Sequence, residues 1–342
     1  MGTFGNEHGV VLPVSAGQLT RREIREAGTE WGEWRRSSHG RYVPSYVDLT
    51  PVQRVAEAGL LVPAPGAVTG WGSLAWQRAR WFGGLRRDGV TPCPVDVATP
   101  RRLLRPQPLL HLCEERFDVR EVVVVDGLRV TSAVRSVCFC MRYAPNLDAA
   151  VEALDMGAYS DLASIEEVAE WASQHPSYTG IDQCRRAVPL GDENAWSPAE
   201  VDFRLDWFAT TGRMPLTNRP VFDLAGRHIA TPDVIDPGTG VAGEYDSTLH
   251  LEGTRRAIDL KRETRVREHG LHPVVMVTAD RHDREAYHHR LRSAYATAAR
   301  TPAIERRWTL ELPPWWVPTF TVAQRRALTA GQRKRFLAHR TG

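Results

Sequence analysis

The amino-acid sequence predicts an α/β protein whose C-terminal part has a mixed central sheet flanked by helices. Two observations lead to this class. The segments after Ser197 follow the order helix, three strands, helix, strand, helix, and such alternation is typical of a sheet covered by helices. The chain also has 342 residues, which is too long for one ordinary hydrophobic core and indicates at least two domains.

The C-terminal domain is expected over residues 191–312. Its first helix begins with SPAE, in which Ser197 is the N-cap, Pro198 stands in the first turn and Glu200 completes a capping box. Gly212 is expected to end this helix. The later elements are three strands VFDLAG, HIATPDVID and VAGEYDS, a helix EGTRRAIDLKRETRVREHG, a strand HPVVMVTA and a helix over residues 283–299.

Residues 1–50 are expected to form a winged-helix-like module. QLTRREIREAG predicts a short helix, and WRRSSHGRYVP predicts a β-wing. Arg35, Arg36 and Arg41 lie in this wing and are candidate contacts for the phosphates of DNA. A surface helix and hairpin with solvated arginines is an equally good interpretation.

The region from 51 to 190 is expected to be mixed α/β, and residues 313–342 a separate aromatic and basic tail. Asp126-Gly127 is the dipeptide favoured in type I′ turns and predicts a hairpin. Thr131-Ser132 can cap the helix that follows. The tail has no acidic residue after Phe320, so it is either a solvated helix end or a segment that follows phosphates.

The composition leaves the class of partner open. There are 44 Lys+Arg and 41 Asp+Glu, a net charge of +3, which falls short of the strongly basic balance of many nucleic-acid binders. The five cysteines form no CxxC pair and no zinc spacing, and their odd number and scatter predict buried thiols in a reducing compartment. No run approaches the ~20 apolar residues that cross a bilayer, and no signal segment is evident. A cytoplasmic protein without a membrane partner is therefore expected.

Three carboxylates indicate a divalent-metal site. Asp233 precedes the turn sequence IDPGTGVAG, and Glu244 and Asp246 follow it, so the three acids belong to two neighbouring strands. Glu244 and Asp246 are two residues apart and project from one face of a strand. Mg²⁺ or Mn²⁺ prefers such oxygen ligands and serves phosphodiester hydrolysis. The alternative is that these acids are solvated side chains at strand ends, as Asp236 beside the turn is expected to be.

The segment from Ser197 to Asp280 resembles the very-short-patch-repair-related domain of the PD-(D/E)XK nuclease superfamily, which has a restriction-endonuclease-like fold. The matching motifs are SPAEVDFRL, PDV followed by GEYDSTLH, RRAIDLKRETRVREHG and VVMVT. More faintly, residues 18–186 resemble AbiEi-like antitoxins through HGRYV, TGWGSLAWQRARWFGG and VTSAVRSV.

The nuclease resemblance implies roles for individual residues. Asp233 and Glu244 would bind the metal, Glu200 would be an outer ligand through water, and Asp246 and His250 would assist proton transfer. Asp259, Lys261, Arg262 and Arg265 follow on the next helix, where Arg262 and Arg265 are candidate phosphate contacts. Asp246 stands where the family has a lysine, a departure that puts catalysis in doubt.

The sequence thus predicts a Mg²⁺- or Mn²⁺-dependent DNA endonuclease, in phage defence or DNA repair. The alternative is a non-catalytic DNA-binding regulator or antitoxin-like protein that keeps a degenerate nuclease fold. A third interpretation makes the domain a protein-interaction surface. A second copy of the chain and a partner protein of a toxin-antitoxin or defence system are the protein partners that remain open.

Overall fold

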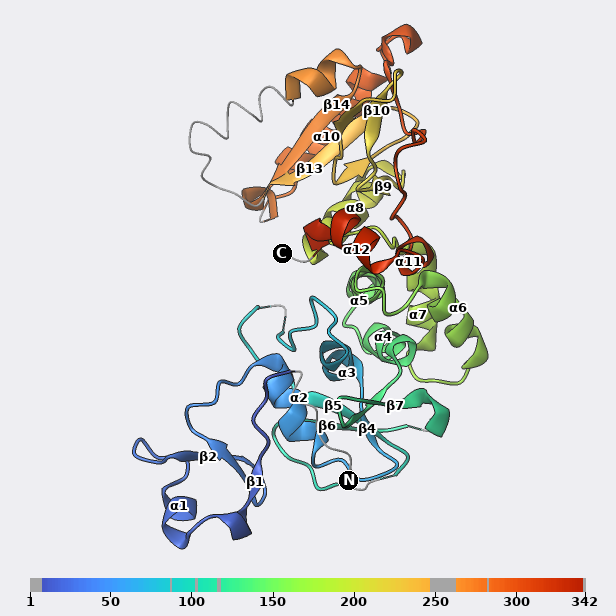
Figure 1. Cartoon of the computed structure of the whole chain (residues 1–342). Coiled ribbons are helices and arrows are strands. Elements are labelled where there is room, and N and C mark those ends of the chain that lie inside the picture. Colours follow the sequence, from blue (N-terminus) through green and yellow to red (C-terminus); the bar gives the residue numbers. More distant parts are fainter. Residues whose placement is uncertain are drawn as a thin grey trace. The chain divides into compact units, whose positions relative to one another are not determined.

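The computed structural model describes residues 8–86, 88–101, 104–115, 118–246, 263–281 and 283–340. The chain divides into two compact units, residues 1–189 and 190–342, shown in Figure 1. Both units combine helices with sheets. The predicted mixed α/β class is therefore confirmed.

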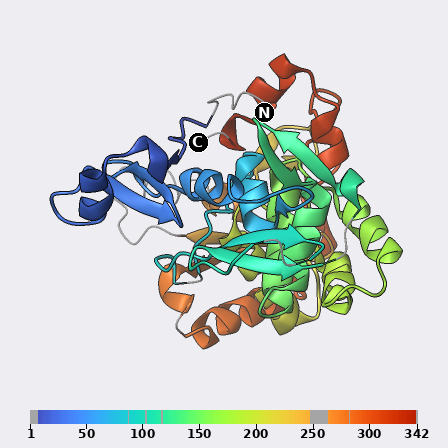
Figure 2. The same ribbon diagram turned by 90° about the horizontal axis from the view of Figure 1, so that it is seen from below.

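The first unit begins with a small three-stranded sheet of order β1-β3-β2 (Figure 2). Its elements are β1 (Val14–Ser15), α1 (Arg21–Glu26), β2 (Trp34–Ser38) and β3 (Arg41–Pro44). The expected short helix and β-wing are both present. Among the described residues of this module, however, α1 is the sole α-helix, so the helical part of a winged helix is incomplete here.

A five-stranded sheet of order β6-β5-β4-β8-β7 forms the centre of the first unit. Its strands are β4 (Ala67–Val68), β5 (Val95–Thr99), β6 (Leu110–Glu114), β7 (Val122–Val125) and β8 (Leu128–Thr131). Helices α2 (Pro51–Gly59) and α3 (Gly70–Trp76) pack on it through a core that includes Val55, Trp76 and Val97. Burial of these apolar side chains is the main source of stability for this layer.

The hairpin of β7 and β8 turns at Asp126 and Gly127, whose φ angles are 44° and 78°. Two positive φ angles define the type I′ turn that this dipeptide predicts. Ser132 then caps the next helix by accepting a hydrogen bond from the Arg135 amide. Four helices follow, namely α4 (Ala133–Arg142), α5 (Leu147–Tyr159), α6 (Ile165–Gln174) and α7 (Ile181–Ala187).

The second unit contains a four-stranded mixed sheet of order β14-β13-β12-β9. These strands are β9 (Leu216–Thr217), β12 (Val234–Ile235), β13 (Val241–Asp246) and β14 (His272–Val277). β13 runs parallel to β14 and antiparallel to β12. The sheet thus has the mixed strand directions predicted for the C-terminal domain.

Two strands predicted for the central sheet belong to a different sheet. The segments VFDLAG and HIATPDVID supply β10 (Val221–Asp223) and β11 (His228–Ala230), which form a separate sheet with β15 (Trp308–Thr309). The segment HIATPDVID is split because Pro232 stands between β11 and β12, and proline has no amide hydrogen to donate to a strand ladder.

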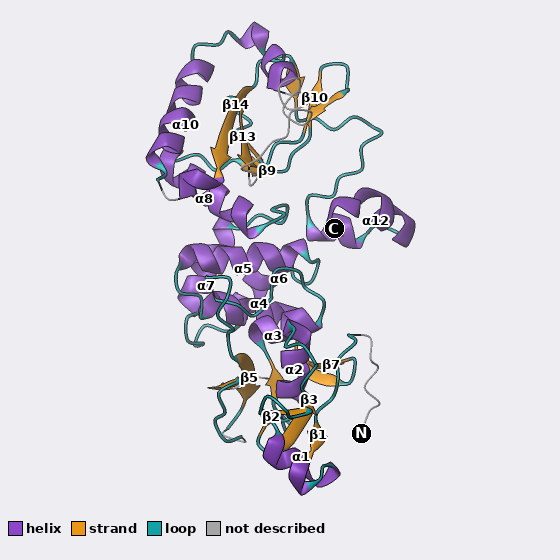
Figure 3. Ribbon diagram, turned by 90° about the vertical axis from the view of Figure 1, so that its left-hand side faces the viewer, coloured by secondary structure: helices purple, strands orange, loops and turns teal. Residues whose placement is uncertain are grey.

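Helices cover both faces of the four-stranded sheet. α8 (Pro198–Thr211) and α10 (Glu285–Ala298) lie to one side (Figure 3), where Phe203, Trp207 and Tyr287 are buried with Met276. A helix over residues 263–268 places Val266 in the core on the other side. This agrees with the predicted sheet flanked by helices.

The expected separate tail is instead packed within the second unit. Its helices α11 (Val322–Arg326) and α12 (Ala330–Phe336) follow Phe320, which is 8% exposed. The Val322 amide donates to the Glu193 carboxylate, and the rings of Trp196 and His339 lie 4.2 Å apart. Over the described residues, no helix has the length and apolar character needed to cross a membrane.

Candidate metal site on the four-stranded sheet

Asp233 lies beside β13 because the antiparallel β12–β13 hairpin pairs Val234 with Gly243. The Asp233 carboxylate accepts a hydrogen bond from the Tyr245 amide at 2.7 Å. Tyr245 is the residue between Glu244 and Asp246. The hairpin predicted from the sequence therefore brings the first acid to the backbone that carries the other two.

The register of β13 with β14 fixes which face these acids share. Tyr245 pairs with Met276, and both pack into the core beneath α8 and α10. Glu244 and Asp246 alternate with Tyr245, so they project from the opposite face. Their neighbours there are the partly exposed Val275 and Val277 of β14, at 41% and 37% exposure.

The three acids are not brought together as a group whose ligand atoms all lie within 4.8 Å of one another; among the described residues only Asp96, His111 and Cys113 form such a group. Asp233, Glu244 and Asp246 are all of intermediate exposure, so they are neither fully solvated nor sealed in the core. Their only side-chain ligand atoms are carboxylate oxygens, which Mg²⁺ and Mn²⁺ prefer. Partial burial also strengthens the interaction of the carboxylates with a cation.

Glu200 has the contacts of a helix cap. Its carboxylate accepts hydrogen bonds from the Trp196 amide at 2.9 Å, the Ser197 hydroxyl at 3.0 Å and the Asn218 side-chain amide at 2.7 Å. Burial raises the pKa of this carboxyl group, and these hydrogen bonds oppose the rise. Both oxygens are therefore engaged in holding the start of α8, which is the alternative that the capping sequence predicts.

Glu200 is still linked to the hairpin through one residue. Asn218 donates its side-chain amide to Glu200 and its backbone amide to the Asp233 carbonyl at 2.9 Å. The carboxylate of Glu200 thus supports the backbone that carries Asp233. Its role as an outer metal ligand remains a prediction.

Several predicted residues lie outside the described residues, namely His250, Asp259, Lys261 and Arg262. Arg265 is described and is exposed on the helix over 263–268. This helix contacts the sheet through Val266 in the core with Ala242. Ala242 is two residues before Glu244 on β13, so Arg265 belongs to a helix that covers the acid-bearing face.

Asp236 corrects the sequence interpretation. It was expected to be a solvated turn residue, but it is 5% exposed. Its carboxylate accepts hydrogen bonds from the Gly238 amide at 2.7 Å and the Tyr295 hydroxyl at 2.9 Å, and it lies 3.6 Å from Arg213. Asp236 therefore fixes the turn between β12 and β13 against α10, which holds the hairpin in place.

The three wing arginines differ in what they contact. Arg35 holds Glu57 through two hydrogen bonds of 2.9 and 2.5 Å, and Glu57 is 2% exposed. Arg36 donates to the Ser38 carbonyl at 3.3 Å, and Arg41 is exposed on β3. Arg35 is thus an internal ion-pair residue, whereas Arg36 and Arg41 face solvent.

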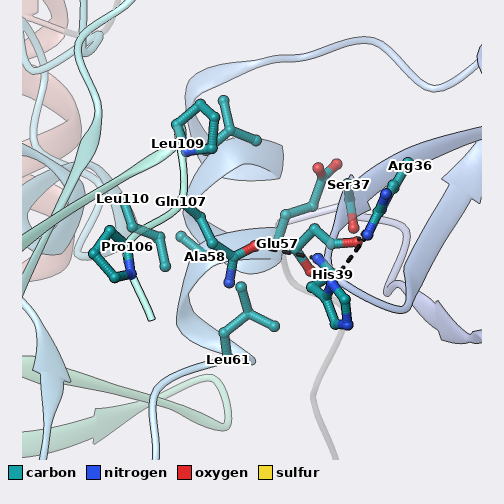
Figure 4. Close-up of a pocket in the computed structure, with 12 residues that line it drawn as sticks. Arg36, Ser37, His39, Glu57, Ala58, Leu61, Pro106, Gln107, Leu109 and Leu110 are labelled. Atoms are coloured by element: carbon teal, nitrogen blue, oxygen red, sulfur yellow. Dashed lines mark hydrogen bonds between the residues drawn. The ribbon is translucent and has the colours of Figure 1, made fainter. Parts of the chain in front are cut away.

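A cavity of about 450 Å³ lies between the wing and the α/β part of the first unit (Figure 4). Arg36 is 3.0 Å from the His39 ring, and the His39 amide donates to the Gln107 side chain at 3.1 Å. Gln107 precedes β6. The tip of the wing is therefore hydrogen-bonded to the α/β part and does not project freely.

One group of side chains that could hold a metal ion was not predicted from the sequence. Asp96 on β5 lies beside His111 and Cys113 on β6. The cysteine spacing alone predicts only that Cys113 is a buried thiol. The available signal was the spacing of His111 and Cys113, because residues two apart share one face of a strand.

The chain matches no protein-family model, no curated protein and no solved structure. The resemblance to PD-(D/E)XK nucleases and to AbiEi-like antitoxins therefore rests on the motifs of this sequence.

Proposed function

We propose that the second unit is a Mg²⁺- or Mn²⁺-dependent DNA endonuclease with Asp233, Glu244 and Asp246 at its centre. The observation that supports this most is the hydrogen bond from the Tyr245 amide to Asp233, which holds the Asp233 carboxylate beside the strand that carries Glu244 and Asp246. Carboxylates on neighbouring strands can supply the oxygen ligands for metal-assisted phosphodiester hydrolysis.

In this proposal Asp233 and Glu244 hold the cation. A cation bound there would polarise the scissile phosphate and lower the pKa of a bound water. Asp246, two residues further along the same face, would orient that water or accept its proton. Arg265 extends from the helix over this face and would contact a phosphate.

Asp246 favours a second candidate function. It occupies the position of the lysine that positions the attacking water in PD-(D/E)XK enzymes, and a carboxylate cannot stabilise negative charge on phosphate as an ammonium does. A DNA-binding regulator that keeps the fold without cleavage is therefore the alternative. The wing residues Arg36 and Arg41 would contact DNA in either case.

The test is incubation of the full chain with supercoiled, linear, nicked, mismatched and single-stranded DNA, with Mg²⁺ or Mn²⁺. We expect metal-dependent cleavage of at least one substrate, lost in Glu244→Gln. Cleavage that persists in Glu244→Gln would contradict the assigned site. Salt-sensitive binding without cleavage of any substrate would contradict the nuclease proposal and favour the DNA-binding regulator.

A further inference from the structure

We propose that the first unit binds one zinc ion between strands β5 and β6, with Asp96, His111 and Cys113 as its ligands. A carboxylate oxygen of Asp96, the ring nitrogen of His111 and the sulfur of Cys113 all lie within 4.8 Å of one another. Carboxylate, imidazole and thiolate are the ligands that zinc uses in proteins. This site is separate from the carboxylates of the second unit and does not depend on the proposed nuclease activity.

The sheet itself brings the three ligands together. β5 and β6 are parallel neighbours in which Asp96 pairs with His111, so these two side chains leave the same face. Cys113 is two residues after His111 and shares that face. A site on paired strands is held by the strand ladder, and its ligands do not depend on a loop for their position.

The distances suit a tetrahedral ion. Nδ1 of His111 lies 3.6 Å from Sγ of Cys113 and 2.8 Å from Oδ1 of Asp96. Zinc bonds of about 2.1 Å to nitrogen and 2.3 Å to sulfur, at a tetrahedral angle, separate these two atoms by about 3.6 Å. The oxygen and nitrogen are closer because they share a hydrogen bond, and they need to part by only about 0.6 Å to receive the ion.

The fourth ligand is expected to be water. The His111 side chain is 57% exposed, which gives the ion and a water molecule access from solvent. Glu115, just after β6, does not supply the ligand because it accepts hydrogen bonds from Arg135, Arg142 and Tyr143. Three protein ligands and one water form the open type of zinc coordination.

A catalytic Cys–His–Asp triad is a poorer account of the same residues. In such a triad the histidine uses one ring nitrogen for the nucleophile and the other for the carboxylate. Here Nδ1 of His111 faces both Cys113 and Asp96.

Cobalt(II) titration of the metal-free full chain tests the site, because cobalt replaces zinc and its bond to a thiolate gives a charge-transfer band in the near-ultraviolet. Every cysteine of the chain lies in the first unit, so cobalt on the carboxylates of the second unit cannot give this band. We expect one equivalent of cobalt to produce the band and one equivalent of zinc to remove it.

His111→Asn and Cys113→Ser are the decisive variants. His111 is exposed enough that its substitution leaves the fold intact, and we expect each variant to lose the band and to bind cobalt more than about 10-fold more weakly. Cys93→Ser is the matched control and should keep wild-type binding. Absence of the band in the wild type, its persistence in His111→Asn, or its loss in Cys93→Ser would overturn the proposal.

Discussion

Asp233 has two separable roles, and two substitutions distinguish them. Its carboxylate accepts the Tyr245 amide at 2.7 Å and is proposed to bind a cation. Asp233→Asn keeps a side-chain oxygen that can accept this hydrogen bond but removes the charge. Asp233→Ala removes both, so the amide of Tyr245 loses this partner.

A hydrogen bond to a charged group contributes about 1.5–3 kcal/mol. We therefore expect Asp233→Ala to lower the free energy of local opening at β13 by that amount, which makes the Tyr245 amide exchange roughly 10- to 100-fold faster. Asp233→Asn should change exchange by less than about 10-fold, because the net contribution of a neutral hydrogen bond is about 1 kcal/mol. Both variants should lose Mn²⁺ binding.

Hydrogen-exchange mass spectrometry of the peptide containing residues 241–246 measures this difference, with Glu244→Gln as the control for loss of charge alone. The reasoning is refuted if Asp233→Ala leaves exchange of this peptide unchanged. It is also refuted if Asp233→Asn accelerates exchange as much as Asp233→Ala does.

Three further predictions concern the cap, the hairpin and the wing. Burial raises the pKa of Glu200 above its ordinary value of 4.5. The contribution of Glu200 to stability is therefore lost as pH rises through the raised pKa. Unfolding of wild type and Glu200→Gln across this range should show that the variant gains stability relative to wild type as pH increases. A Cβ on Gly243 would lie 2.7 Å from side-chain atoms of three core residues. Thermal unfolding should therefore show that Gly243→Ala is destabilised by about 1–3 kcal/mol. The control Gly331→Ala should not be destabilised, because the space around Gly331 is open. Arg41→Ala should weaken DNA binding and reduce the slope of log K against log salt concentration by about one, without loss of stability. Arg35→Ala leaves the buried Glu57 without this partner and should lower the free energy of unfolding by about 3–5 kcal/mol. Equal stability of the two arginine variants would contradict their assignment.

Local signals in the sequence predicted local structure well. The turn at Asp126 and Gly127 has the two positive φ angles that this dipeptide favours. Ser197 and Gly212 cap the two ends of α8 as their types predict. Each of these features depends on residues close in sequence, whose conformational preferences are fixed before the chain packs.

The sequence patterns did not predict contacts between residues that are far apart in the chain. The burial of Asp236 depends on the Tyr295 hydroxyl, 59 residues away, and the sequence around the turn does not show that partner. Asp96 and His111 meet because β5 and β6 pair in one register, which periodicity alone does not determine. Strand alternation did predict that Glu244 and Asp246 share a face, because that relation is local to β13.

Mn²⁺ titration of the full chain, followed by electron paramagnetic resonance of the free ion, most directly tests whether the acids of the β12–β13 hairpin hold a cation. We expect a bound ion that Glu244→Gln and Asp233→Asn lose and that Cys113→Ser retains, because Mn²⁺ prefers oxygen ligands. The same Mn²⁺ affinity in wild type, Glu244→Gln and Asp233→Asn would contradict the proposed metal site.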